Sequence, residues 1–182
     1  MITIPQAIAA DYEKWRTFMY DKVDFALKTS KIHTKEHCSR VLLFALLMAD
    51  RLGLPQEEKD ILAMASVFHD TRRLNDRPDV GHGARAAEYY KQYCKEYGLP
   101  YQQRTYDAMA FHDQDDKLGV ATIESRVPRE KDAVLIYKIF KDADALDRYR
   151  LGPGGFDPNY LRNQAARDLL GYAKEVWESW DK

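Results

Sequence analysis

Hydrophobic residues recur three or four positions apart along almost the whole chain, which is the spacing of one face of an amphipathic helix. The first such stripe predicts a helix near the N-terminus and consists of Ile8, Tyr12, Trp15, Met19 and Val23. Pro5 stands at the expected start of this helix, where the missing N–H of proline removes no helical hydrogen bond. We expect this helix to pack on the core and to carry no chemistry of its own.

The same periodicity predicts further helices, separated by turn residues. The second helix spans about residues 34–52, turns an apolar stripe inward together with His37, and ends at Gly53. Later helical stripes fall in the segments 54–70, 82–98, 100–112 and 134–146. Because no long segment alternates as a strand does, the pattern predicts an all-α fold, a helical bundle.

Three interruptions separate these stripes. Residues 71–81 form a polar loop, and an irregular segment follows residue 113 and reaches Val127–Pro128. Within that segment, residues 120–123 are the one short candidate for a strand. Beyond a glycine-rich break at residues 152–155, a last helix or pair of helices ends at Trp180 and docks on the core.

Length and composition limit the class of protein. The chain has 182 residues, of which 45% are hydrophobic and 31% charged, and this fits one soluble domain over residues 1–182. The net charge of −1 offers no basic excess for bulk nucleic-acid binding, and charge interrupts the apolar runs short of a membrane span. Two cysteines indicate a reducing compartment without a disulfide framework. Since the N-terminus lacks a signal-peptide layout, we expect a cytoplasmic protein.

The histidines and one acidic cluster bring in the chemistry. The histidines are His33, His37, His69, His82 and His112, and the acidic cluster is Asp142-Ala143-Asp144-Ala145-Leu146-Asp147. Asp70 follows His69 directly, at the end of an apolar helical run. Adjacent helical residues point about 100° apart, so both side chains reach one point only near the helix end. A metal ion at that point would take an imidazole nitrogen and a carboxylate oxygen, whereas the alternative is a pair that only caps the helix.

In chain order these residues read His37, then His69-Asp70, and finally Asp144. This order resembles the HD superfamily of metal-dependent phosphohydrolases, whose core pattern is H…HD…D. The resemblance covers roughly residues 33–150, including His37-Cys38-Ser39-Arg40-Val41, and leaves flanking helices at both ends. It implies a single-domain helical bundle of the HD type.

The resemblance also implies the metal ligands. The first set is His37, His69, Asp70 and Asp144. In family members with two metals, extra histidines lie between the HD pair and the final Asp, where His82 and His112 stand, and Asp70 would bridge the two ions. We therefore expect one or two divalent ions, of manganese, iron, cobalt, nickel, magnesium or zinc, with Asp70, His82 and His112 as catalytic residues. As alternatives, His37 is a core histidine bonded to a backbone carbonyl, and His82 and His112 are helix caps or phosphate-binding or general-acid groups beside a single ion.

Anion-binding residues are expected next to these ligands. Arg73 and Arg148 are favoured for a substrate phosphate, because a guanidinium matches phosphate oxygens and both residues lie close to ligand positions. Asp147 is one helical turn from Asp144 and shares its face, so it orients a ligand histidine, contacts substrate, or pairs with a nearby arginine. By contrast, we expect His33 to be solvated and Cys38, about 100° round the helix from His37, to face away from the site.

The sequence thus favours a metal-dependent phosphohydrolase that acts on a phosphomonoester or phosphodiester through metal-activated water. The partner would be a small phosphorylated substrate, and a nucleotide fits that class; a homo-oligomer is compatible with the sequence. One alternative is a di-iron oxygenase of the same superfamily, which would use the same ligands. Another is a non-catalytic nucleotide-binding module, against which the intact ligand set argues. The chain has no Glu-Asp dipeptide, which lowers the case for a guanosine tetraphosphate hydrolase.

Overall fold

The structure, a computed structural model, describes residues 3–180, and this part of the chain consists of helices and connecting loops without a strand, which confirms the all-α fold. In chain order the elements are α1 (Gln6–Lys22), α2 (Lys35–Arg51), α3 (Gln56–Phe68), α4 (His82–Tyr97), α5 (Gln103–Ala110), α6 (Asp116–Glu124), α7 (Ala133–Leu146), the 3-10 turns η1 (Asp147–Leu151) and η2 (Pro158–Tyr160), α8 (Gln164–Arg167) and α9 (Leu170–Ser179).

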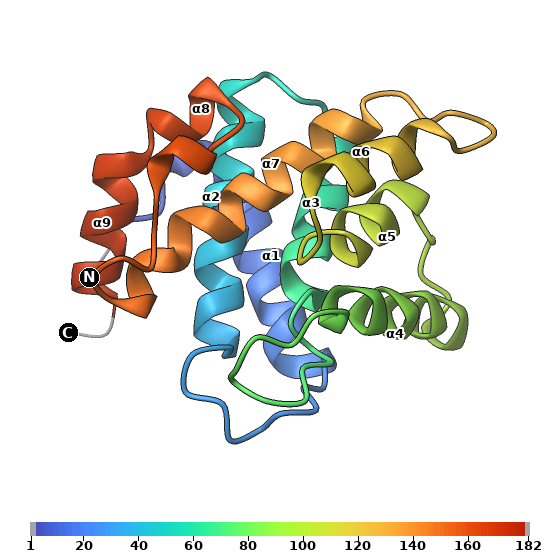
Figure 1. The fold of residues 1–182 in the computed structure, drawn as a ribbon, viewed down its shortest axis with the longest axis horizontal. Helices are drawn as coiled ribbons and strands as arrows, with labels where there is room; N and C mark the ends of the chain where they lie inside the picture. The colour runs from blue at the N-terminus through green and yellow to red at the C-terminus, as the bar shows by residue number, and fades with distance from the viewer. Residues whose placement is uncertain (1–2, 181–182) are drawn as a thin grey trace.

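Helix α2 is the centre of the bundle. Every residue from His37 to Ala49 is buried, and α2 contacts α1, α3 and α7 (Figure 1). Its start is fixed by Thr34, whose side chain accepts a hydrogen bond from the backbone N–H of His37. A helix that is apolar on nearly all sides is stable only when other helices surround it, so its composition dictates its central place.

The helices that carry the other site residues pack tightly on one another. Helix α4 lies against α5, and its Gly83 faces the backbone carbonyl of Met109 and the ring of His112 so closely that a Cβ would collide with both. Glycine is therefore required at this point for α4 and α5 to approach. The approach brings the start of α4 and the end of α5, each of which bears a histidine, to the same place.

Two loops close one end of the bundle, at the bottom of Figure 1. One connects α1 to α2 and the other runs through residues 71–81. They are joined by a hydrogen bond from the Ala26 N–H to the Thr71 carbonyl at 2.9 Å and by one from the Ser30 hydroxyl to Asp76 at 2.5 Å. Since both loops lead into or out of ligand-bearing helices, this contact gathers the candidate ligands at one end.

The segment that the sequence read as irregular, with a strand candidate at residues 120–123, is instead helix α6. Asp115 begins it as an N-cap whose side chain accepts from the Lys117 N–H at 2.8 Å. Ile123 is buried in a small separate cluster with Ala133 and Tyr137. A run of four residues is too short for periodicity to distinguish a strand from a helix. The packing of Ile123 against α7 is compatible with the helix.

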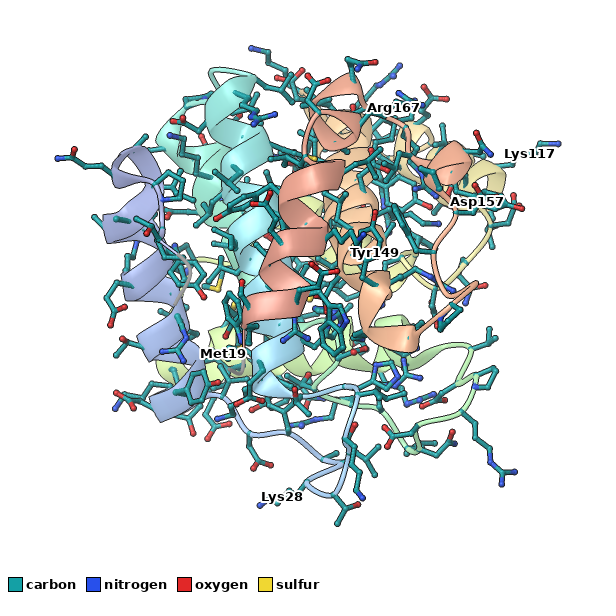
Figure 2. All side chains as sticks on the ribbon, turned by 90° about the vertical axis from the view of Figure 1, so that its left-hand side faces the viewer. Met19, Lys28, Lys117, Tyr149, Asp157 and Arg167 are labelled. Carbon is teal, nitrogen blue, oxygen red and sulfur yellow. The ribbon has the colours of Figure 1, made fainter. Side chains whose placement is uncertain are left out.

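The C-terminal helix docks beside α2, as the sequence predicted. Figure 2 shows α9 next to α2, and Ala173 and Val176 of α9 are buried in the main core. Arg40 of α2 lies over the rings of Trp177 and Trp180, 5.3 Å and 5.5 Å from their centroids, within the range of cation–π attraction. Among residues 3–180, no helix combines the length and the apolar character needed to cross a membrane.

Candidate metal centre

Three of the candidate ligand histidines are oriented by the same kind of hydrogen bond to the backbone. The Nδ1 atoms of His69, His82 and His112 each lie 2.7–2.9 Å from the backbone carbonyl three residues earlier in the chain, those of Ser66, Asp79 and Met109. A carbonyl can only accept, so each Nδ1 carries the hydrogen and each Nε2 presents a lone pair. Metal-binding histidines commonly show this arrangement, with the second ring nitrogen donating to a fixed acceptor.

His37 is held in the same tautomer by a carboxylate. It lies in the first turn of α2, fully buried, and its Nδ1 is 2.6 Å from Asp147 Oδ2. Its Nε2 faces the Nε2 of His69 at 3.1 Å. The alternative of a core histidine bonded to a backbone carbonyl is therefore wrong, because the partner is the Asp147 carboxylate and the other nitrogen points at a second imidazole.

The possible ligand atoms meet in three overlapping groups around Asp70, of which one, His33 with His37 and Asp70, shares its members with the other two apart from His33. His37, His69 and Asp144 form the first cluster, and Asp70, His82 and His112 form the second; in each, one possible ligand atom per residue lies within 4.8 Å of the others. Asp70 Oδ2 is 3.4 Å from His37 Nε2, while its Oδ1 is 3.1 Å from His82 Nε2. Asp70 thus faces both clusters, one oxygen to each.

The donor set suits a cation. In the second cluster the Nε2 atoms of His82 and His112 are 2.9 Å apart, although both Nδ1 atoms already hold their hydrogens on carbonyls. His82 Nε2 can accept a hydrogen bond from Arg73 Nη1 at 3.0 Å, but the lone pair of His112 still faces His82 Nε2, an arrangement that a proton or a metal ion between them would stabilise. Imidazole nitrogens and carboxylate oxygens together are ligands for manganese, iron, cobalt, nickel and zinc, so the residues present fit a divalent metal.

The pKa values of the two histidines in the first cluster also favour a cation between them. Burial and Arg150 lower the pKa of His37, but hydrogen bonds with Asp144, Asp147 and Asp70 outweigh them and raise it to about 9. Burial lowers the pKa of His69 to about 3. Without a metal, His37 therefore favours the protonated form and His69 the neutral form, and the two Nε2 atoms face each other at 3.1 Å, a geometry that suits one shared proton or a cation.

The second cluster repeats this arrangement. Burial lowers the pKa of His82 and Arg73 opposes its charging, whereas Asp113 and Asp70 raise the pKa to about 9. Burial and the neighbouring His82 lower the pKa of His112. Asp70, although buried, has its pKa held well below the usual range by His69, His33 and the other imidazoles around it.

Asp144 and Asp142 point in different directions on α7. Asp144 Oδ1 lies 3.4 Å from His37 Nε2, and its side chain is 26% exposed on the cavity side. Asp142 is fully buried and accepts from the backbone N–H groups of Arg162 and Asn163. The sequence placed Asp144 nearer the buried face; Asp142 is in fact the more buried, because the cavity beside Asp144 admits solvent.

His33 and Cys38 lie closer to the ligands than expected. His33 is half-buried, with Nδ1 2.7 Å from Asp70 Oδ2, because its backbone N–H is held by Ser30 in the folded-back loop. Cys38 is fully buried with Sγ 3.9 Å from His69 Nδ1. Cys38 thus lies behind His69, against the ring nitrogen that is turned from the clusters, and it belongs neither to the candidate ligand groups nor to the cavity wall.

Asp147 occupies a place behind His37. It is 1% exposed, pairs with Arg40 at 2.5 Å and with Arg150 at 3.5 Å, and is not part of the cavity wall. Its position corresponds to the orientation of a ligand histidine and not to substrate contact. Sequence reasoning missed Arg40, although its spacing of three residues from His37 placed it on the same helical face.

A cavity of about 690 Å³ opens onto both clusters. Its wall includes His33, Asp70, Asp144, His82 and His112 as well as Arg73 and Arg148, the two arginines favoured for phosphate. Arg148 Nε donates to the Gly155 carbonyl at 2.7 Å, and within residues 3–180 its terminal nitrogens make no hydrogen bond that would compete with a phosphate. Lys141 and Arg162 also reach the wall, but Asp116 binds both.

Fold and site together define an all-helical protein with paired histidine–aspartate clusters. A family model for the HD domain matches residues 34–149, from the N-cap of α2 into η1. The chain therefore belongs to the HD-domain family, which confirms the resemblance seen in the sequence and places it in a superfamily of metal-dependent phosphohydrolases. No curated protein and no solved structure gave a significant match.

Proposed function

We propose that the protein hydrolyses a small phosphate ester with the help of one or two divalent metal ions. One observation supports the proposal most strongly. Four histidines each bind an acceptor through Nδ1, which leaves Nε2 available as a ligand, and the four Nε2 atoms surround the two oxygens of Asp70. Family membership makes phosphoester hydrolysis the first chemistry to test. A pure binding module would have no use for this complete ligand set.

The proposed metal ligands are His37, His69, Asp70 and Asp144 for the first ion, with Asp70, His82 and His112 for a second. A divalent ion bound there would lower the pKa of a bound water toward neutrality and offset charge on phosphoryl oxygens. The protein's own part is to fix the hydrogen on each Nδ1 and to aim each Nε2 at the site, through the carbonyl anchors and Asp147. This fixed orientation supports tight, geometrically defined binding.

We infer that the substrate is a small phosphorylated molecule, with a nucleotide as the leading example. The cavity volume of about 690 Å³ lies within the range of small-molecule sites. Arg73 and Arg148 would bind the phosphate from the cavity wall. Phe156 and Tyr160 line the outer part of the same cavity and provide aromatic surface for a base or another apolar group.

Metal analysis of protein purified without added metal, followed by turnover assays, tests the proposal. We expect manganese, cobalt, nickel, magnesium or zinc to support hydrolysis of p-nitrophenyl phosphate, bis(p-nitrophenyl) phosphate or a nucleoside monophosphate. Asp144→Asn should lose this activity, while Asp142→Asn, on the same helix but turned away, should keep it. Iron with the spectrum of a mixed-valent pair, and oxygen consumption in place of phosphate release, would replace the hydrolase with a di-iron oxygenase.

A further inference from the structure

The second cluster already has a positive charge of its own. Arg73 Nη1 lies 3.0 Å from His82 Nε2 and 3.5 Å from Asp70 Oδ1. These are two of the three atoms that would bind a second ion. The Arg73 side chain is only 6% exposed, so solvent does little to screen its charge from the cluster.

The guanidinium is held in this place by the 71–81 loop. Its Nη2 donates to the Arg77 carbonyl at 2.9 Å, and its Nε lies 3.4 Å from the Asn75 carbonyl. These anchors are backbone oxygens of a loop that is exposed over most of its length. The first cluster differs: the charge of Arg150 acts on His37 from a distance, but within residues 3–180 its guanidinium binds Asp147 and the Ile32 carbonyl and touches none of His37, His69 and Asp144.

We propose that Arg73 is an internal counter-cation for the second cluster, so that a second divalent ion binds only when the guanidinium swings away. This inference rests on the proposed metal site. It makes the two sites unequal: within residues 3–180 no guanidinium contacts the candidate ligand atoms of His37, His69 and Asp144, whereas a second ion must displace Arg73 from His82 and Asp70. Loading of the second site is then governed by Arg73.

Charge and space support this displacement. A guanidinium and a dication on the same ligands repel strongly in a site shielded from water. The acids around the second cluster, Asp70 and Asp113, are matched in part by Arg73, so its departure leaves negative charge for the incoming ion. Arg73 also lines the cavity, which gives its side chain room to move without unfolding the loop.

Calorimetric titration of Mn²⁺ into the metal-free full chain tests the inference. We expect the wild type to bind one ion tightly and a second at least tenfold more weakly. Arg73→Gln, which removes the charge, should tighten the second step at least tenfold and leave the first unchanged. Arg73→Lys retains the charge on a flexible stem and should resemble the wild type in the second step more than Arg73→Gln does.

Arg77→Gln is the matched control, because Arg77 belongs to the same loop and cavity wall but its side chain contacts neither cluster within residues 3–180. It should titrate like the wild type. If Arg73→Gln proves unfolded by circular dichroism, Arg73→Met, which keeps the apolar stem, replaces it. The inference is overturned if the charge-neutral variant binds its second ion no more tightly than the wild type, or if the wild type fills both sites equally well. Failure of every protein to bind any ion would instead refute the proposed function.

Discussion

Asp147→Asn should have two effects that can be measured separately, a weaker orientation of His37 as a metal ligand and a lower stability of the fold. The substitution keeps the side-chain volume but removes the charge that fixes His37 Nδ1 at 2.6 Å. Loss of such an outer partner typically weakens metal binding by about 10–100-fold, which corresponds to roughly 1.4–2.8 kcal/mol. Since His37 is not part of the cluster of Asp70, His82 and His112, affinity for the first ion should fall while that for the second changes little.

The same substitution should destabilise the protein. Arg40 pairs with Asp147 at 2.5 Å and its side chain is only 4% exposed, so the variant leaves a buried charge without its partner. Breaking such a pair costs about 3–5 kcal/mol, somewhat reduced here by the rings of Trp177 and Trp180, which still face the guanidinium. Urea unfolding of the metal-free protein measures this loss.

Asp142→Asn provides the comparison, because Asp142 is also fully buried and ion-paired, with Arg162, yet contacts no candidate ligand. It should lose stability and keep its metal affinity. Parallel calorimetric titrations with Mn²⁺ then decide. If Asp147→Asn is as destabilised as Asp142→Asn but binds its first ion with wild-type affinity, Asp147 does not orient His37 and the reasoning is refuted.

Three further predictions concern the ligands themselves. Asp70→Ala should abolish metal binding and turnover, since it removes the one carboxylate that faces both clusters; a folded variant with wild-type metal content would contradict this. Asp144→Asn should weaken metal binding in a calorimetric titration, whereas Asp142→Asn should not, and equal losses would contradict the orientation seen on α7. His82→Ala/His112→Ala should retain about one ion per chain and lose most turnover; a metal count equal to that of the wild type, by elemental analysis, would end the two-ion proposal.

The candidate metal ligands could be predicted from the sequence for a physical reason. His37, His69, Asp70 and Asp144 lie on or at the ends of long periodic helices, so their faces follow from spacing alone. The same argument showed that Asp144 and Asp142, two positions apart on α7, point in different directions, although it assigned the more buried face to Asp144 when Asp142 is the buried one. Helices with strong apolar stripes leave little freedom in which face turns inward, and this is why the fold class and the family were both predicted.

The conformation of the loops and the contacts between residues far apart in the chain could not be predicted in this way. His33 reaches Asp70 only because the loop before α2 folds back onto residues 71–81, through contacts 45 or more residues apart. The pairing of Arg40 with Asp147 joins residues 107 positions apart. Helix propensity and periodicity are local properties and cannot specify such pairs. For the same reason, the carbonyl anchors of the histidines appear only once the backbone at each helix end is known.

The pH dependence of stability offers a last test, which distinguishes the metal-free from the metal-loaded protein. The pKa of His37 is about 9 in the folded protein and about 6.5 when unfolded. Because the folded state holds this proton more tightly, its contribution to stability is fully present below pH 6.5 and is lost as pH rises through 9. A shift of this size corresponds to a loss on the order of 3 kcal/mol.

A bound metal reverses this behaviour, because it takes the place of the proton and binds better as pH rises. We therefore expect the urea midpoint of metal-free protein to fall between pH 6.5 and 9, and that of protein with excess Mn²⁺ to hold steady or rise. His82, whose pKa is also raised to about 9, contributes a fall of the same sign, so His37→Gln should make the metal-free profile shallower over this range and His37→Gln/His82→Gln should flatten it. A metal-free midpoint that stays level or rises from pH 6.5 to 9 in the wild type would show that no proton is held between His37 and His69, and the argument that a cation belongs there would lose its electrostatic support.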